Sequence, residues 1–214
     1  MYKVTHIVLG APDPDVLFPK PDKNDAVIGV DSGAIECQKR TIPLTLALGD
    51  FDSITIEEKE IIKAYAKKVE VLKTDKDDTD AELALKVAME NYPSEKIVFY
   101  NWLGGRVDHL MSILHLIYQP RFQPITEKIS FKNKKNIFRF FKPGAHEIEA
   151  DESKRYLSFI GMTPIDKLTL NNVKYPLEEA FYSYPISLVS NEIVGSNCQF
   201  SFEKGVLGVI QSSD

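Results

Sequence analysis

The first half of the chain alternates short apolar segments with longer amphipathic ones, and this alternation restricts the fold more than any other feature. The apolar segments are rich in Val, Ile and Leu, which is typical of buried strands. They span residues 4–9, 26–30, 44–48, 69–72 and 97–100. Short strands that alternate with helices predict an open, mostly parallel α/β sheet.

Helical periodicity is clearest in three of the intervening segments. Two of these begin with a Thr that is followed three residues later by a Glu, at Thr55 and Glu58 and at Thr79 and Glu82. This spacing predicts a capping box, in which the two side chains satisfy free backbone N–H groups at the helix start. The third helical pattern covers about residues 107–118.

The pattern changes near Gln119, where the helical period stops and QPRFQP reads as a linker. Beyond it come short segments with strand character, bounded by turn candidates such as Pro143-Gly144. The segments are KISFK, NIFRFF, RYLSFIG, KLTL, ISLVS, CQFSFE and GVLGVIQ. The sequence therefore predicts two domains, an α/β domain over residues 1–122 and an all-β sandwich or barrel over residues 123–214.

Composition excludes several classes of protein. The net charge is -5 and no long Lys/Arg run occurs, which argues against sequence-independent binding of nucleic acid. Cys37 and Cys198 stand in unrelated contexts, so neither a disulfide framework nor a zinc site can be built from them. The sequence shows no signal-peptide pattern and no apolar stretch of membrane-spanning length, so we expect a cytoplasmic protein without a membrane partner.

Acidic residues follow four of the predicted strands at the point where each strand ends. Asp31 follows the second apolar segment, Asp50 and Asp52 follow the third, and Asp108 comes after the fifth. The fourth leads into TDKDDTD, which contains Asp75, Asp77, Asp78 and Asp80. The carboxyl ends of parallel strands share one edge of a sheet, where ligands bind. We therefore expect these acids to gather at a single binding edge.

Such a cluster of acids repels itself unless cations stand among them. Carboxylate oxygens with room for water suit Mg²⁺, which usually combines a few carboxylates with substrate phosphates. Lys76 and Arg106 come from the same loops and can pair with phosphate oxygens. Gly104 and Gly105 would let the backbone approach an anion closely. Together these features favour phosphoryl-type transfer, in which positioning and charge neutralisation provide most of the catalysis.

A purely structural explanation competes for each acid taken alone. Asp and Thr are ordinary helix caps, and acids in a first turn favour the helix dipole. Asp80, directly after the presumed cap Thr79, fits this explanation well, and Asp31 also precedes a helix. The explanation weakens for four loops together, and it fits GDFDS least because no helix there needs a cap. No Walker A pattern or dinucleotide fingerprint occurs, and only one histidine, His109, lies in the proposed site.

The motifs resemble those of the bacterial thiamin pyrophosphokinases. DSGA, GDFDS, TDKDDTDAELAL and GGRVDH occur in the order of that family and at roughly its spacing. GMTPIDKLTLNNVKYPL and ISLVSNEIVG are similar to its β-domain, so the resemblance covers nearly the whole chain. It implies an α/β catalytic domain followed by a β-sandwich, usually in a homodimer. It also implies Mg²⁺-dependent transfer of pyrophosphate from ATP to thiamin, with release of AMP.

The resemblance further implies roles for individual residues. Carboxylates that would hold Mg²⁺ are those of Asp50, Asp52 and Asp80. Side chains that would meet ATP are those of Asp31, Lys76, Thr79, Arg106 and His109. Acids that would act in catalysis are Asp31, Asp52, Asp80 and Asp108. Contacts to thiamin would come from the β-domain through Ser190 and Asn191.

The sequence departs from the family at a few positions, and other functions stay open. Ala11 stands where a second glycine is frequent, Ser32 replaces a glycine, and NWL precedes the glycine pair. Trp102 of this segment can belong to the core or line the site, and we expect it in a loop or in the site wall. The alternative functions are another Mg²⁺-dependent phosphotransferase, phosphohydrolase or nucleotidyltransferase on the same acidic edge, and a non-catalytic binding module such as a receiver domain.

Overall fold

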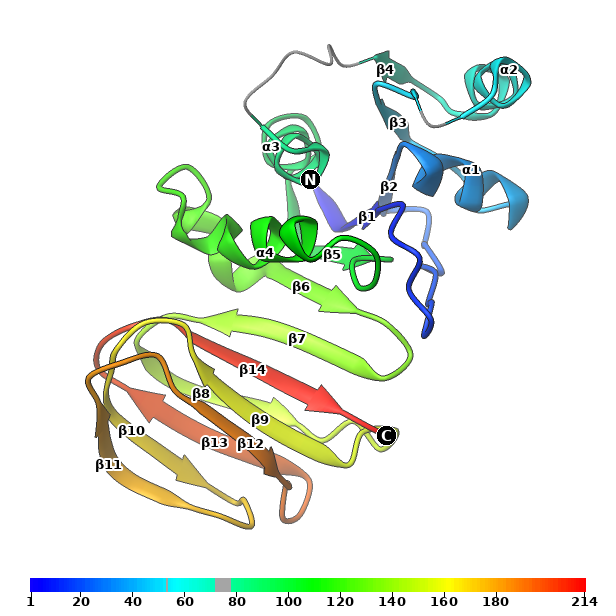
Figure 1. The fold of residues 1–214 in the computed structure, drawn as a ribbon. Coiled ribbons are helices and arrows are strands. Elements are labelled where there is room, and N and C mark those ends of the chain that lie inside the picture. Colours follow the sequence, from blue (N-terminus) through cyan, green and yellow to red (C-terminus); the bar gives the residue numbers. More distant parts are fainter. Residues whose placement is uncertain (53, 72–77) are drawn as a thin grey trace. The chain divides into compact units, whose positions relative to one another are not determined.

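The computed structural model describes residues 1–52, 54–71 and 78–214, which divide into two compact units. The first unit spans Met1–Lys134 and the second Lys135–Asp214 (Figure 1). The first combines helices with a parallel sheet and the second is an antiparallel sandwich, so the predicted fold class is confirmed.

The first unit is built on a sheet of parallel strands in the order β6-β5-β1-β2-β3-β4. Its strands are β1 Tyr2–Val8, β2 Ala26–Val30, β3 Leu46–Gly49, β4 Val69–Val71, β5 Ser94–Tyr100 and β6 Ile129–Lys132. The chain winds outward from β1 to β4 and then returns to β5 on the other side of β1. The winding therefore reverses between β1 and β5, and such a switch point opens a crevice at the carboxyl ends of the strands.

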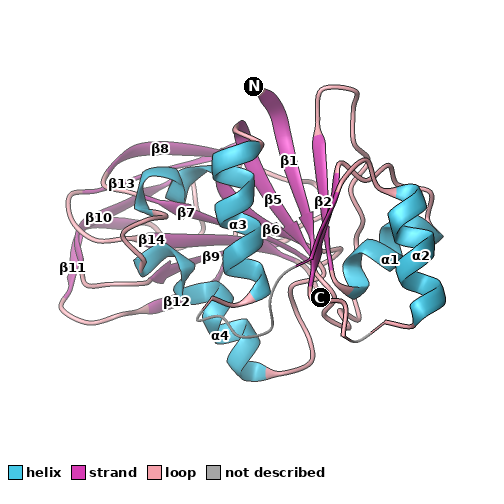
Figure 2. Cartoon of the chain, turned by 90° about the horizontal axis from the view of Figure 1, so that it is seen from above, coloured by secondary structure: helices cyan, strands magenta, loops and turns pink. Residues whose placement is uncertain are grey.

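Helices cover both faces of this sheet. They are α1 Ser32–Lys39, α2 Ile56–Tyr65, α3 Asp80–Asn91 and α4 Val107–His115, with the 3₁₀ helices η1 Leu116–Tyr118 and η2 Gln123–Lys128. Figure 2 shows α1 and α2 on one side of the sheet and α3 and α4 on the other. Ala34 of α1 and Ile62 of α2 are buried in a core cluster with Val27 of β2, which fixes these two helices on their face.

Both predicted capping boxes are present, and they determine where α2 and α3 begin. The Glu58 amide donates to Thr55 Oγ1 (3.2 Å), and the Thr55 amide donates to Glu58 Oε2 (3.0 Å). The same reciprocal pair joins Thr79 and Glu82, at 3.3 and 2.6 Å. Each box satisfies amides that have no partner within the helix.

The second unit consists of two antiparallel sheets. Its strands are β7 Asn136–Phe141, β8 Gly144–Glu149, β9 Tyr156–Gly161, β10 Ile165–Asn171, β11 Leu177–Tyr182, β12 Ser187–Asn191, β13 Asn197–Phe202 and β14 Leu207–Ser212. One sheet has the order β12-β9-β14-β7 and the other β11-β10-β13-β8. Their inner faces meet in a core that contains Phe159, Leu168 and Phe200, all at most 2% exposed.

The segment 119–132 differs from the sequence-based expectation. QPRFQP reads as a linker, but it lies between η1 and the start of η2, and Phe122 within it is fully buried. Residues 128–132, expected to open the all-β half, end in β6, which pairs in parallel with β5. The boundary between the compact units therefore falls after Lys134, later than the boundary predicted between residues 122 and 123.

None of the helices within the described ranges combines the length and apolar character that a membrane span requires.

Candidate functional site

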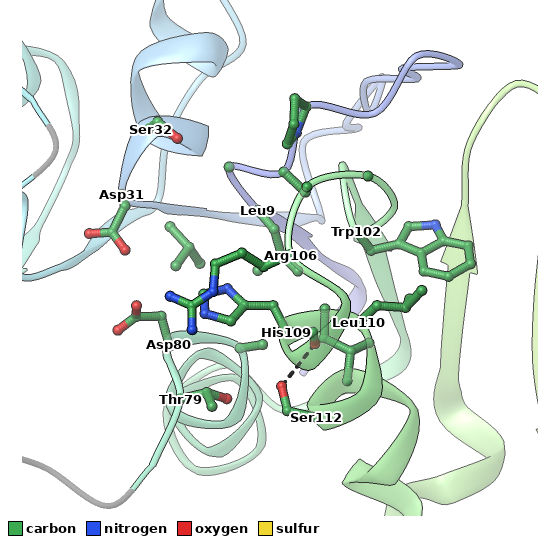
Figure 3. A pocket seen from close by; sticks show the side chains of 18 residues that line it. Leu9, Asp31, Ser32, Thr79, Asp80, Trp102, Arg106, His109, Leu110 and Ser112 are labelled. Carbon is green, nitrogen blue, oxygen red and sulfur yellow. Dashed lines mark hydrogen bonds between the residues drawn. The ribbon is translucent and has the colours of Figure 1, made fainter.

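A cavity of the first unit lies at the switch point between β1 and β5. Its volume is about 510 Å³. Its walls come from the loop after β1, the junction of β2 and α1, the start of α3, the loop after β5, and α4. The residues that line it are Leu9, Gly10, Ala11, Pro12, Val30, Asp31, Ser32, Thr79, Asp80, Ala81, Trp102, Gly104, Gly105, Arg106, His109, Leu110, Ser112 and Ile113. Figure 3 shows these side chains around the opening.

Asp31 occupies a strained position between β2 and α1. Its φ and ψ angles are 46° and -121°, a region that side-chain-bearing residues rarely adopt. Although it immediately precedes α1, its side chain makes no capping hydrogen bond to that helix. Asp31 Oδ1 instead accepts the Phe51 amide at 3.2 Å. The carboxylate is therefore turned away from its own helix and toward the loop after β3, which is not the geometry of a helix cap.

The loop after β3 makes room for this carboxylate. A Cβ atom added at Gly49 would come within 1.9 Å of Asp31 Oδ1, so only a glycine fits there. Phe51 follows with a positive φ of 55° and is 4% exposed, so its ring anchors the loop in the core. Asp50 and Asp52 flank this anchor, and the Asp52 amide donates to Asp50 Oδ1 at 3.0 Å.

Two acids from other loops affect Asp31 at the cavity edge. Burial raises the pKa of Asp31 to about 6, and the charges of Asp80 and Asp50 add to this effect, while the Phe51 amide opposes it. A hydrogen bond to the Asp80 side chain contributes to the same rise. Figure 3 shows Asp31 and Asp80 pointing toward one another. Carboxyl groups this close share a proton or require a cation, so the arrangement can hold a positive ion.

Asp80 is held there by the start of α3. It is the first residue of the helix, directly after the capping residue Thr79. The Thr79 hydroxyl is engaged by the Glu82 amide, so it already serves the capping box, and a contact to ATP stays a prediction. Lys76, expected to meet ATP from the same motif, lies outside the described residues.

The loop after β5 forms the opposite wall, and its glycines have a packing role. Gly104 and Gly105 have φ angles of 96° and 75°. A Cβ atom at Gly104 would lie 2.7 Å from the carbonyl oxygen of Pro12, so this glycine lets the loops after β1 and β5 meet. Trp102, which follows β5, lines the cavity as expected of a site-wall residue, and its ring lies 5.3 Å from that of Phe131.

Arg106 and Asp108 pair with each other at the start of α4. Arg106 Nε donates to Asp108 Oδ1 at 3.1 Å and Nη2 donates to Oδ2 at 2.5 Å. The Arg106 hydrogen bonds lower the pKa of Asp108. Both side chains are mostly exposed, at 70% and 62%, so water screens the pair. A polyphosphate could therefore compete with Asp108 for this arginine.

The structure groups the predicted site residues of the first unit in two sets. Those that line the cavity are Asp31, Thr79, Asp80, Arg106 and His109. Those outside its lining are Asp50, Asp52 and Asp108; Asp50 lines a smaller cavity of about 150 Å³ beside α2 instead. Through the Phe51 anchor, however, Asp50 stays close enough to raise the pKa of Asp31.

Ser190 and Asn191, predicted to meet thiamin, end strand β12 of the second unit. Ser190 has a positive φ of 60°, and its amide donates to Ser158 Oγ at 3.3 Å. Asn191 is only 5% exposed, and its Oδ1 accepts the amides of Tyr175 (3.0 Å) and Glu192 (2.9 Å). Its Nδ2 donates to the Tyr175 carbonyl at 2.9 Å. Asn191 thus ties two loops together, and contacts of these residues to thiamin stay a prediction.

Several cavity residues are absent from the sequence-based set. Ser112 and Ile113 of α4 lie three and four positions after His109, and that spacing places them on the same helix face. The helical period was therefore a usable signal for them. Ser32 and Ala11 also line the cavity, although the sequence analysis noted them only as departures from the family and gave them no role in the site.

Comparisons with known proteins agree with this architecture. A family model described as thiamin pyrophosphokinase, catalytic domain, matches residues 21–129, and one described as thiamin pyrophosphokinase, vitamin B1 binding domain, matches residues 145–207. Thiamine pyrophosphokinase of Bacillus subtilis (strain 168) is 39% identical over 217 residues, which cover 99% of this chain and 100% of the relative.

Solved structures show the same likeness. A thiamin pyrophosphokinase family protein from Enterococcus faecalis is 34% identical with a TM-score of 0.94, and 99% of each chain is covered. Thiamine pyrophosphokinase from Bacillus subtilis is 36% identical with a TM-score of 0.88, with 99% of this chain and 100% of the other covered.

Proposed function

Because the chain belongs to the thiamin pyrophosphokinase family, we propose that it transfers pyrophosphate from ATP to the hydroxyl of thiamin and releases AMP. One observation above all supports placing this chemistry at the cavity between β1 and β5. Asp31 and Asp80, from loops far apart in the sequence, face one another at the edge of the 510 Å³ cavity at the switch point of the sheet. Carboxylates held in mutual repulsion suit a site that receives a metal ion together with its substrate.

The reaction exchanges one oxygen–phosphorus bond for another. The thiamin hydroxyl oxygen would bond to the β-phosphorus of ATP, and the bond from this phosphorus to the α–β bridging oxygen would break. AMP leaves with the electron pair of that bond, and the hydroxyl proton passes to a base or to solvent. Little covalent chemistry is left to the protein, so holding both substrates in line and balancing charge would provide most of the rate.

The donor set fits Mg²⁺. Asp50 and Asp80 offer hard carboxylate oxygens, and both lie close enough to Asp31 to raise its pKa. Among the described residues, no three His, Cys, Asp or Glu side chains already form a complete ligand set. Mg²⁺ commonly takes only one or two protein carboxylates and completes its shell with water and phosphate, so this arrangement suffices. We propose that Asp50, Asp52 and Asp80 hold the ion, which would neutralise charge on the transferred phosphates.

Arg106 and Asp108 have complementary roles in this proposal. Arg106 lines the cavity and can turn its planar fork from Asp108 to phosphate oxygens. Once released, Asp108 loses the partner that lowers its pKa and becomes available to orient the thiamin hydroxyl. His109, Thr79 and Lys76 would contribute further contacts to ATP, and Asp31 would lie beside the nucleotide.

We propose that thiamin is bound with the help of the second unit, through Ser190 and Asn191. Support for this comes from the match of residues 145–207 to the vitamin B1 binding domain. Action as a homodimer in the cytoplasm is proposed on the family resemblance. The two buried, unpaired cysteines are compatible with that compartment.

The proposal is tested by measuring AMP and thiamin diphosphate formed from ATP, thiamin and Mg²⁺, with a chelated reaction as control. Equal amounts of both products, lost on chelation, are expected. ATP consumption without thiamin diphosphate would indicate a phosphohydrolase or another acceptor. No ATP consumption with any acceptor would favour a non-catalytic binding module.

A further inference from the structure

Arg121 lies in the QPRFQP segment between η1 and the start of η2, which the sequence predicts to be a linker without a role in the site. Its Nη1 and Nη2 donate to Asp78 Oδ2 and Oδ1 at 2.8 and 2.6 Å, a two-pronged ion pair. Its Nε donates to Gln119 Oε1 at 2.7 Å, and its guanidinium lies 4.6 Å from the centre of the buried Phe122 ring. The guanidinium is therefore fixed by ion pairing, hydrogen bonding and stacking at once.

The same arginine connects to the start of α3 by a second route. Gln119 Nε2 donates to Glu82 Oε1, and Glu82 Oε2 accepts the Thr79 amide at 2.6 Å. Arg121 Nη2 also lies 3.9 Å from Glu82 Oε1. Glu82 is 9% exposed, so its charge needs these partners. Arg121 and Gln119 together thus reach the carboxylates of Asp78 and Glu82 in the α3 capping region.

These contacts hold residues on either side of Asp80 in the sequence, and Asp80 is the residue that faces Asp31. Asp78 and Thr79 directly precede Asp80, the first residue of α3. The Asp78 and Arg121 side chains are only 25% and 35% exposed, so solvent screens this pair less than it screens Arg106 and Asp108. A partly buried ion pair at Asp78 restricts the backbone that leads into Asp80 more than an exposed pair would.

We propose that Arg121 is a positioning residue of the phosphate-transfer site, which clamps the Asp78–Asp80 turn and thereby aims Asp80 at Asp31 for binding Mg²⁺–nucleotide. The inference rests on the proposed function, because it gives a role to the acids of that site. It does not make Arg121 a catalytic residue, since Arg121 does not line the cavity. Groups that orient a metal ligand typically affect metal affinity or activity by about 10- to 100-fold.

The test compares Arg121→Ala with Arg40→Ala. Arg40 is a matched control: it also pairs with a glutamate, Glu36 (2.5 Å), and lies 4.0 Å from the centre of the Phe18 ring, but it does not line the cavity. Mg²⁺ is titrated by calorimetry into each protein saturated with a non-hydrolysable ATP analogue. The Mg²⁺ concentration for half-maximal thiamin diphosphate formation is measured alongside.

Arg121→Ala is expected to raise the Kd for Mg²⁺ and the half-maximal Mg²⁺ concentration by about 10-fold or more, while Arg40→Ala changes neither. Arg121→Lys keeps the charge but loses the planar fork, so an intermediate Kd is expected. Wild-type Mg²⁺ affinity in a folded Arg121→Ala protein would overturn the positioning role alone. Failure of the wild-type protein to bind Mg²⁺–nucleotide would overturn the proposed function as well.

Asp78→Asn decides the question if Arg121→Ala does not fold, as judged by circular dichroism. This variant keeps Arg121, Gln119 and Glu82 and removes only the charge of the carboxylate with which Arg121 forms its ion pair. A Kd for Mg²⁺ several-fold above that of the wild type is expected. An unchanged Kd would contradict the clamp, because its main ion pair would then have no effect on the site.

Discussion

The acidic loops of the first unit and the loops joined by Asn191 in the second unit differ in how their polar side chains are satisfied. Both were predicted as functional from short sequence motifs. In the second unit, the oxygen of the Asn191 amide accepts two backbone amides and its nitrogen donates to a carbonyl. An amide oxygen has two lone pairs, so both are used within the protein.

In the first unit, carboxylate faces carboxylate. Asp31 accepts one backbone amide, but its other near neighbours include Asp80 and Asp50, and its pKa rises to about 6 as a result of burial and of these charges. A loop whose polar groups are satisfied internally holds the fold together. A loop whose carboxylates repel one another keeps its conformation only because the surrounding structure holds it. A bound cation would therefore stabilise such a loop more than one whose polar groups are already paired.

The comparison predicts the largest loss of activity at Asp80. Asp80→Asn should lower kcat by at least about 100-fold, the loss typical when one preorganised electrostatic group is removed from a transition-state site. Asp52→Asn should act likewise if this acid holds Mg²⁺. Thiamin diphosphate formation measures the rate, and circular dichroism checks that the fold survives.

Glu57→Gln is the matched control for this experiment. Glu57 is an exposed acid in the first turn of α2, as Asp80 is an acid in the first turn of α3, so both changes remove the same helix-dipole interaction. It should leave kcat unchanged. Near-wild-type rates in both aspartate variants would contradict the metal assignment and remove the contrast between the two regions.

The fold could be predicted wherever strands bury apolar side chains. β2 is buried along its whole length, and its predicted bounds agree with the structure. β8 and β11 were not predicted, and they are the two edge strands of their sheet. Most of their residues are not buried, so acids replace the apolar residues and the alternation that marks a strand is lost.

The segment around Arg121 shows where composition misleads. Its prolines and glutamines are typical of a linker. Phe122 is nevertheless fully buried, and Arg121 forms an ion pair with Asp78, which is far away in the sequence. Nothing local to QPRFQP signals that partner, because the contact exists only once the sheet is assembled.

The candidate site was predictable to the same extent. The rule that strand ends share one edge brings Asp31 and Asp80 together, as the sequence analysis expected. The pairing of Arg106 with Asp108 and the internal hydrogen bonds of Asn191 depend on side-chain neighbours instead. Motif spacing alone cannot distinguish a residue that meets a ligand from one that shapes the loop around it.

A stability measurement can sharpen the comparison at Asn191. Asn191→Ala would leave the amides of Tyr175 and Glu192 and the Tyr175 carbonyl without this partner, so a loss of about 1–3 kcal/mol in the free energy of unfolding is expected. Urea unfolding measures it. Gln199→Ala, which removes an exposed hydrogen bond to Glu147, should cost less than about 0.5 kcal/mol. Unchanged stability with a raised KM for thiamin would instead favour a direct contact to the substrate.

The smallest change is expected in the free energy of unfolding of an Asp31 variant. Its sign distinguishes the acidic loops, where removing a charge should stabilise, from the loops around Asn191, where removing a polar group should destabilise. The pKa of this carboxyl is raised from 3.8 to about 6 in the folded protein, so the fold disfavours its charged form. The stability that the protonated Asp31 carboxyl contributes is fully present below pH 3.8 and is lost as the pH rises through about 6. In Mg²⁺-free buffer, Asp31→Asn should therefore stabilise the protein at pH 8 by about 1 kcal/mol, after allowance for solvent screening, and by much less near pH 4. Urea unfolding of wild type and variant at the two pH values measures the difference.

Saturating Mg²⁺ should reduce or reverse this stabilisation by Asp31→Asn, because a nearby cation favours the charged carboxylate. Lower stability of the variant at pH 8 without Mg²⁺ would mean that the charge of Asp31 is well compensated, and the acidic edge would then resemble the loops around Asn191.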